Sequence, residues 1–159
     1  MIAAGGGVGL RPLRDDDEAA ATRILNEPEV AHWWLRQQWE RVVEEGSVSF
    51  AIVVGDEVVG VIQYSEELDP DYVSVAVDLF VGARFQDRRV GRRALEAMID
   101  YLVRERGHHR ITVDPAADNA RAIHVYEALG FRPVGVMHAY ERGPDGVWHD
   151  GLLMELVVE

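Results

Sequence analysis

The spacing of apolar residues changes period along the chain, and this alternation limits the folds open to it. Helical spacing covers the ranges 15–25, 28–46, 90–107 and 119–130. Period-two or β-branched runs cover the ranges 9–13, 49–54, 58–64, 72–81, 110–113, 131–140 and 147–157. Strands that alternate with helices predict an α/β domain with a mixed central sheet. We expect about six to seven strands and roughly four helices.

Length and residue content predict one self-sufficient core. The chain has 159 residues, of which 48% are hydrophobic, enough for one domain without cross-links. We assign that domain to residues 9–159 and interpret the glycine-rich residues 1–8 as a flexible N-terminal tail. No cysteine is present, which excludes disulfides, thiolate metal sites and a cysteine nucleophile. The six histidines show no metal-ligand spacing, and we expect no metal and a solvated His108–His109 pair.

The charge balance indicates the class of partner. A formal net charge of −12 argues against nucleic acid, because binding there depends on phosphate contacts. An acidic cleft would attract a cationic small molecule, although acidity also serves solubility alone. Neither a signal peptide nor an apolar span of membrane length is present. We therefore expect a cytoplasmic protein without a membrane partner, compatible with a monomer or a homodimer.

Positive charge is concentrated at one place in this acidic chain. Five arginines fall within ten residues, at Arg84, Arg88, Arg89, Arg92 and Arg93. They lie between a valine-rich strand and an amphipathic helix that begins near residue 90. The unpaired N–H groups of a helix N-terminus bind anions, and arginine forks pair with phosphate oxygens. The cluster is therefore either a site for a polyanion or a solvated helix face paired with nearby carboxylates.

The last predicted helix carries a second motif, Asn119-Ala120-Arg121-Ala122-Ile123-His124-Val125-Tyr126-Glu127-Ala128-Leu129-Gly130-Phe131. Asn119 suits the N-cap and Gly130 the C′ position. The spacing Asn-x-Arg-Ala-x-x-x-Tyr-Glu-x-x-Gly-Phe resembles the second acetyl-CoA-binding motif of GNAT acetyltransferases. The arginine-rich loop resembles their first motif, (Gln/Arg)-x-x-Gly-x-(Gly/Ala), through Gln86 and Gly91. The resemblance covers nearly the whole chain and implies a GNAT fold with acetyl-CoA-dependent transfer to an amine.

The resemblance also implies where acetyl-CoA binds. It places the cosubstrate across the loop and along the Asn119 helix, with the Val81 backbone N–H at the thioester carbonyl. The implied contact residues are Leu79, Val81, Gln86, Asp87, Arg88, Arg89, Val90, Gly91, Arg92, Asn119, Ala122 and Tyr126. Arg89 departs from the pattern, because the family usually has glycine there for close approach of the backbone to pyrophosphate.

Two residues are candidates for proton transfer. By the resemblance, Tyr126 is the general acid that protonates the departing thiolate; the alternative is ordinary packing on an apolar helix stripe. Asp78 is the only charged residue in the run from Val73 to Val81, where a buried carboxylate needs a partner. We interpret Asp78 as the base that takes the amine proton, directly or through water, with a structural salt bridge as the alternative.

The acceptor is predicted from a narrower resemblance. The segments Leu25–Trp34, Ala76–Asp78 and Thr112–Pro115 are similar to those around the sugar amine in aminoglycoside 6′-N-acetyltransferases. Asp114 is then a contact for the substrate ammonium or only an Asp-Pro turn residue, and Trp33 and Trp34 wall the acceptor site or fill the core. Siderophore acyltransferases share much of this layout, so alternatives are a siderophore intermediate, a polyamine, a protein N-terminus, or a weakly catalytic acyl-CoA-binding module.

Overall fold

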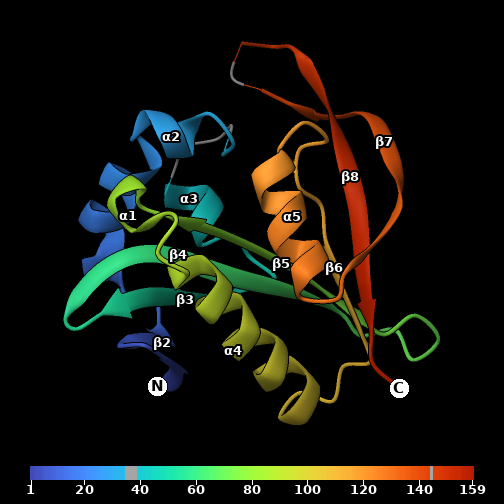
Figure 1. Cartoon of the computed structure of the whole chain (residues 1–159), viewed down its shortest axis with the longest axis horizontal. Helices are drawn as coiled ribbons and strands as arrows, with labels where there is room; N and C mark the ends of the chain where they lie inside the picture. Colours follow the sequence, from blue (N-terminus) through green and yellow to red (C-terminus); the bar gives the residue numbers. More distant parts are fainter. Residues whose placement is uncertain (35–38, 144) are drawn as a thin grey trace.

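The computed structural model describes residues 1–34, 39–143 and 145–159, and its strands form one mixed sheet (Figure 1). The strand order is β1-β2-β3-β4-β5-β6-β8-β7, and only the β5–β6 junction is parallel. The eight strands are β1 (Ile2–Gly5), β2 (Val8–Pro12), β3 (Ser47–Val54), β4 (Glu57–Glu67), β5 (Ser74–Val81), β6 (Arg110–Val113), β7 (Arg132–Arg142) and β8 (Trp148–Val157). The mixed α/β architecture is as predicted, with one strand more than the upper estimate.

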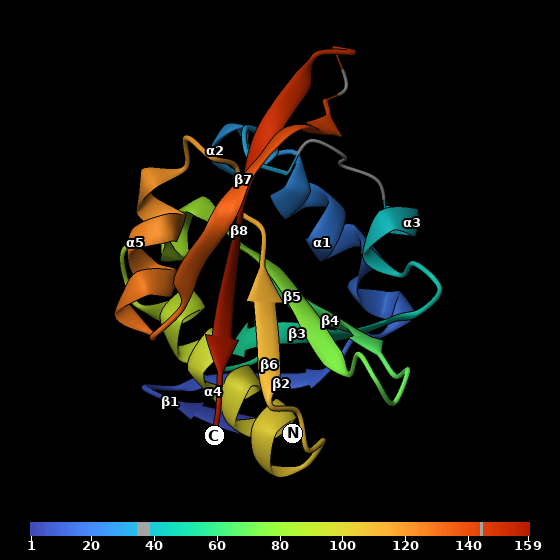
Figure 2. The same ribbon diagram turned by 90° about the vertical axis from the view of Figure 1, so that its right-hand side faces the viewer.

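Helices cover both faces of this sheet. Figure 2 shows α4 and α5 on one side and α1 and α3 on the other. The helical segments are η1 (Asp15–Asp17), α1 (Glu18–Leu25), α2 (Pro28–Ala31), α3 (Trp39–Val42), η2 (Ala83–Phe85), α4 (Val90–Arg104) and α5 (Ala120–Ala128). Among the described residues, no helix is long and apolar enough to cross a membrane.

The extra strand lies in the segment that we expected to be a flexible tail. Residues 2–5 pair antiparallel with β2 instead. Gly5, Gly6 and Gly7 all have positive φ, so they form the tight turn between the two strands. A Cβ on Gly6 would lie 2.8 Å from the Arg93 Nε atom, which shows how closely the turn packs on α4. The glycines of residues 1–8 thus serve a hairpin, and the tail interpretation is wrong.

The predicted helix over residues 28–46 is also corrected. It is replaced by the single turns α2 and α3, and residues 35–38 of the prediction lie outside the described residues. Pro28 occupies the first turn of α2, where its missing N–H costs no hydrogen bond. The other predicted helices keep their starts, since α4 begins at Val90 and the Asn119 side chain caps α5.

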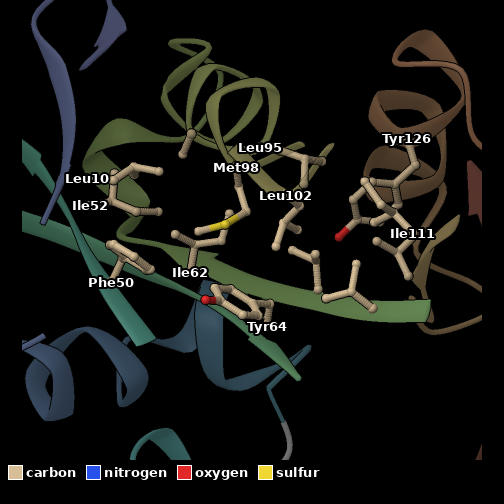
Figure 3. Packing of buried hydrophobic residues seen from close by; sticks show 14 of the residues in the cluster. Leu10, Phe50, Ile52, Ile62, Tyr64, Leu95, Met98, Leu102, Ile111 and Tyr126 are labelled. Carbon is tan, nitrogen blue, oxygen red and sulfur yellow. The ribbon is translucent and has the colours of Figure 1, made fainter. Parts of the chain in front are cut away.

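The main core lies between the sheet and α4 (Figure 3). Leu95, Met98 and Leu102 form the buried stripe of α4 and pack against strand residues such as Ile62 and Ile111. Full burial of one such side chain contributes roughly 1.5–3 kcal/mol. A second cluster on the opposite face joins α1 and α2 to β4 and β5 through Val61 and Phe80.

His108 departs from the expectation of a solvated pair. Its side chain is buried, and its Nε2 lies 2.6 Å from Glu66 Oε2 on β4. Arg106 donates to the other Glu66 oxygen at 2.8 Å. His109 is exposed as expected. The turn at Gly107 therefore joins the end of α4 to the sheet through a shared carboxylate.

Strands β5 and β6 separate soon after they meet. Their parallel pairing joins only Val75 to Ile111 and Ala76 to Thr112, whereas β5 stays paired with β4 along its full length. The residues of β5 beyond Ala76 thus have a strand neighbour on one side only. This divergence opens the interior of the sheet at the carboxyl ends of two parallel strands, where ligands bind in open α/β sheets.

A buried ion pair fixes the start of α1 to β2. Arg11 donates to both oxygens of Asp17, at 2.8 and 2.9 Å, and the Arg14 N–H adds a third bond at 2.8 Å. The Asp17 side chain is only 6% exposed. The Arg11 hydrogen bonds are the main cause that holds the pKa of Asp17 below its ordinary value.

We predict that Asp17→Asn lowers the free energy of unfolding by about 2–4 kcal/mol at pH 7, because Arg11 loses its charged partner. Since the native pKa is depressed, the stabilisation is complete above the unfolded value of about 4 and is lost as pH falls through the native pKa. Urea unfolding should therefore show a smaller difference in unfolding free energy between the wild type and Asp17→Asn at pH 3 than at pH 7. Asp100→Asn removes the exposed Arg104–Asp100 pair and should cost at most about 0.5 kcal/mol; equal losses would contradict the prediction.

Candidate active site

The divergence of β5 and β6 opens into a cleft of about 920 Å³. Its walls come from β5, the loop before α4, the start of α5, the segment after β6, and α2. Every candidate site residue from the sequence lines it except Arg88: Trp33, Trp34, Asp78, Leu79, Val81, Gln86, Asp87, Arg89, Val90, Gly91, Arg92, Asp114, Asn119, Ala122 and Tyr126. Two motifs that lie about thirty residues apart in sequence thus meet in one space.

The loop before α4 has an unusual backbone. Asp87 and Arg89 have φ values of 63° and 62°, in the left-handed region that glycine enters most easily. Arg89 is the N-cap of α4 and makes no side-chain capping bond. The first N–H groups of α4 lack intrahelical acceptors. The position that departs from the family glycine is therefore one where the chain conformation itself favours glycine.

Arg121 belongs to the second motif but was assigned no role from sequence, and it holds this loop against α5. Its guanidinium lies 2.6 Å from Asp87 Oδ1 and donates to Gln86 Oε1 at 3.3 Å. The Gln86 amide in turn donates to the Val81 carbonyl at 3.0 Å. Asp87 and Gln86 thus orient the loop through side-chain bonds. The sequence alone does not reveal this role, because Gln86 and Arg121 are 35 residues apart along the chain.

Some of the clustered arginines pair with carboxylates on the surface, and others remain available to bind a polyanion. Arg84 pairs with Glu57, and Arg92 pairs with Glu96, both at 3.3 Å on the exposed surface. Arg88 and Arg89 are exposed, and neither side chain has an ion-pair partner among the described residues. Uncompensated positive charge therefore remains beside the N-terminus of α4, which favours anions.

The outer edge of β5 presents backbone groups to the cleft. The Gly82 N–H donates to Val59 on β4, so by strand alternation Leu79 and Val81 direct their polar groups away from β4. The Leu79 carbonyl accepts the Trp34 indole N–H at 3.0 Å. With the Val81 carbonyl bonded to Gln86, the Val81 N–H remains on this edge facing the cleft.

Tyr126 projects from α5 toward the sheet, near Ile111 (Figure 3). Asn119 Oδ1 caps the helix by accepting the Ala122 N–H at 3.2 Å. The Tyr126 ring packs edge-on against Phe131, with 5.7 Å between centroids, and the side chain is both part of the core and part of the cleft wall. Burial, and then the carboxylates of Asp78 and Asp114, raise the pKa of Tyr126 above its ordinary value. Tyr126 is therefore protonated at neutral pH.

Carboxylates gather at the other end of the cleft. Asp78 on β5, Asp114 after β6 and Glu141 on β7 line it together. Asp78 is reached by solvent through the open cleft, yet protein surrounds it closely. That burial is the largest cause that raises the pKa of Asp78 well above its ordinary value, and Asp114 and Glu141 raise it further. Burial also raises the pKa of Asp114. Sequence reasoning missed Glu141, which lies just beyond the predicted strand 131–140, because the structure extends β7 to Arg142.

The two tryptophans both line the cleft but differ in their contacts. Trp34 is anchored by its bond to Leu79 and by an edge-on contact with Phe80, 4.9 Å between centroids, so it belongs in part to the second core. Trp33 contacts His32 and lines the cleft. Among the described residues, no group of three or more His, Asp or Glu side chains is arranged to hold a metal ion.

A sequence model of the acetyltransferase (GNAT) family matches residues 10–131. The chain belongs to this family. It is an acetyl-CoA-dependent N-acetyltransferase, and the resemblance seen in its two motifs is confirmed. The matched region includes the arginine loop, β5 and the whole of α5, which are the elements that form the cleft.

Relatives of this GNAT enzyme differ in acceptor. The chain is 23% identical over 163 residues to an aminoglycoside N(6′)-acetyltransferase from Klebsiella pneumoniae, covering 87% of this chain and 79% of the relative. The ribosomal-protein-S5-alanine acetyltransferase of Vibrio fischeri shares its fold, with a TM-score of 0.86 at 19% identity, covering 100% and 97% of the two chains. A Vibrio cholerae spermidine N-acetyltransferase, solved with CoA and spermine, has a TM-score of 0.80 at 17% identity and 96% coverage of both.

We predict that Arg89→Gly raises the free energy of unfolding by about 0.5–1 kcal/mol, because glycine adopts the left-handed conformation without strain. Thermal or urea unfolding measures the change. The matched control is Arg88→Gly, at a neighbouring exposed position without positive φ, where glycine should lower stability or leave it unchanged. A stabilised Arg88→Gly protein, or a destabilised Arg89→Gly protein, would contradict the strain argument.

Proposed function

We propose that this acetyltransferase acts on a primary amine of a small polycationic molecule, an aminoglycoside or related amino sugar acetylated at the 6′-amine. The observation that carries the proposal is the separation of charge within one cleft. Arg89, which has no ion-pair partner among the described residues, and the N-terminus of α4 lie at one end, and Asp78, Asp114 and Glu141 lie at the other. A carboxylate-lined pocket concentrates polycations and speeds their capture.

The positively charged end of the cleft fits the coenzyme. Acetyl-CoA supplies the acetyl group as an activated thioester. The N–H groups of the first turn of α4 and the side chains of Arg88 and Arg89 would hold its phosphates. The Val81 N–H, on the free edge of β5, would donate to the thioester carbonyl as negative charge develops there. Arg121 keeps the loop in position for these contacts through Gln86 and Asp87.

Asp78 acts as the base in this proposal. An acceptor amine is protonated at neutral pH and must lose a proton before it attacks. A carboxylate whose pKa is raised toward neutrality is a better general base than an ordinary aspartate. Asp78 also attracts the cation electrostatically. Its Oδ1 already accepts the Leu79 N–H at 2.9 Å, which fixes the carboxylate and leaves its second oxygen for the amine or a bridging water.

Tyr126 acts as the acid. Its hydroxyl lies in the cleft wall and has no hydrogen-bond partner among the described residues, so it is available to donate. The raised pKa keeps Tyr126 protonated at neutral pH, so the phenol can donate a hydrogen bond and then its proton to the sulfur as the thiolate leaves. Transfer is direct from cosubstrate to amine in this proposal, since the chain has no cysteine and no serine is among the described residues that line the cleft.

The substrate proposal is tested with a matched pair of aminoglycosides. Neomycin and paromomycin differ in a 6′-amine and a 6′-hydroxyl. With acetyl-CoA and detection of free thiol, neomycin and kanamycin should be acetylated with a higher kcat/KM than spermidine or a peptide with N-terminal alanine. Paromomycin should react at least 10-fold more slowly than neomycin. A higher kcat/KM for spermidine or for the peptide would show that the acceptor belongs to that class instead. Absence of acetylation with every aminoglycoside would rule the proposal out.

The proton-transfer roles predict distinct kinetic losses. Tyr126→Phe should lower kcat by roughly 10²–10⁴-fold, with the KM of the acceptor changed little. Asp78→Asn should lower kcat/KM for the acceptor by a similar factor. Because Asp78 must be ionised to act and its pKa is raised, wild-type kcat at saturating acceptor should rise with pH at values well above the ordinary aspartate range. Stopped-assay profiles that lack this acidic limb, or that keep it in Asp78→Asn, would contradict the assignment of the base.

A further inference from the structure

Strand β7 is distorted where it passes the carboxylate end of the cleft. The register between β7 and β8 shifts between Met137 and Glu141. Within this bulge, Ala139 has φ of 49°, a conformation that costs a non-glycine residue energy. Bulges redirect the side chains that follow them. The surrounding structure must therefore hold the bulge, and the next two residues are Tyr140 and Glu141.

Neighbouring groups on β8 hold the bulge. Asp150 Oδ1 accepts the Ala139 N–H at 2.8 Å, and His138 Nδ1 lies 3.4 Å from Asp150 Oδ2. Gly151 leaves room for the next side chain, since a Cβ there would lie 2.9 Å from Tyr140 Cδ2. Asp150 and Gly151 thus define where the Tyr140 ring lies.

The Tyr140 ring lies where its hydroxyl reaches Asp114. The hydroxyl donates to Asp114 Oδ2 at 2.7 Å. Strand β8 holds the backbone after Asp114 as well, because the Leu152 N–H donates to the Pro115 carbonyl at 2.8 Å and the Ala117 N–H to the Asp150 carbonyl at 3.0 Å. The backbone next to Asp114 is thus fixed by β8 and its carboxylate by β7. A carboxylate has about four acceptor positions, so one bond from Tyr140 leaves others for a ligand.

We propose that Tyr140 is a positioning residue that aims the Asp114 carboxylate at an ammonium group of the acceptor and so sets acceptor affinity. This rests on the proposed function, in which Asp114 contacts the substrate. The bulge explains why a tyrosine on an exposed strand serves this end, because the redirected backbone brings its hydroxyl to Asp114. Tyr140 itself need not touch the substrate.

The Tyr140 hydroxyl changes the charge state of its partner in a definite direction. The groups that face Asp114 are Asp78 on β5, Tyr126 on α5, and Tyr140 and Glu141 on β7, with His149 of β8 beside Glu141. The bond to Asp114 raises the pKa of Tyr140 to about 12. Burial raises the pKa of Asp114, and the Tyr140 bond opposes that rise. Without the hydroxyl, Asp114 binds its proton at higher pH and loses its attraction for ammonium there.

The test is Tyr140→Phe, with Tyr72→Phe as the matched control on an exposed loop away from the cleft. With neomycin and spermidine as acceptors, Tyr140→Phe should raise the acceptor KM by roughly 3- to 10-fold. The KM of acetyl-CoA and kcat at saturation should stay within about twofold. The acidic limb of kcat/KM should move to higher pH by roughly half to one pH unit. Tyr72→Phe should leave all four quantities unchanged.

A second variant separates positioning from loss of the hydroxyl. Gly151→Ala keeps the Tyr140 hydroxyl but displaces its ring, and it should raise the acceptor KM in the same direction. If both variants act through one contact, the double variant should lose no more than the larger single loss. Additive losses in the double variant would show that Tyr140 does not act through its place on the bulge, and would overturn the proposal.

A substrate-free measurement keeps this inference apart from the proposed function. Carbon-13 titration of the Asp114 carboxyl, assigned by its disappearance in Asp114→Asn, should show a higher midpoint in Tyr140→Phe than in the wild type. An unchanged midpoint would overturn the proposal even if aminoglycosides are substrates, and so would a raised midpoint with an unchanged acceptor KM. If no polycation is acetylated, the proposed function fails, and the titration still decides whether Tyr140 controls Asp114.

Discussion

The short parallel contact between β5 and β6 is the constraint on which the site depends. Two residue pairs are enough to continue the sheet, and beyond them β5 is held by β4 alone. The backbone N–H and C=O groups of a strand in the middle of a sheet normally form hydrogen bonds to two neighbouring strands. Here Leu79 and Val81 have one strand neighbour and turn to Trp34 and Gln86 for bonds. The fold thereby satisfies the carbonyl groups of this edge and leaves the Val81 N–H directed into the cleft.

The same divergence separates opposite charges across one cavity. The chain carries a net charge of −12, but five arginines lie within residues 84–93, around the start of α4, whereas the carboxylates of Asp78 on β5, Asp114 after β6 and Glu141 on β7 line the cleft together. The protein that surrounds them raises the pKa of both Asp78 and Asp114, and neighbouring carboxylates raise that of Asp78 further, so both hold protons more tightly than ordinary aspartates. That arrangement costs stability in the free protein. It favours binding of a cationic acceptor at the carboxylate end and of a phosphate-bearing cosubstrate at the arginine end.

Sequence reasoning succeeded where one local signal determines structure. The Asn119 cap, the apolar stripe of α4 and the short strand β6 each depend on neighbours in the chain, and all three lie where the pattern placed them. It failed where partners are distant. The glycine content of residues 5–7 hid the hairpin that they form. The buried His108 contacts Glu66, a distant residue on β4. Arg121 and Glu141 join the site through contacts 20 or more residues away along the chain. The roles of Asp78 and Tyr126 remain predictions, since geometry brings them to one cleft without fixing their chemistry.

Backbone strain is also found near the two ends of the cleft. Among the described residues, three other than glycine have positive φ: Asp87, Arg89 and Ala139. Two belong to the loop before α4 and one to the bulge that directs Tyr140 and Glu141, so all three lie at the edges of the cleft. Each costs on the order of 1 kcal/mol, and each is held by bonds to another element, Arg121 for the loop and Asp150 for the bulge. Because such conformations persist only where the surroundings impose them, the two ends of the cleft are set in advance by the fold.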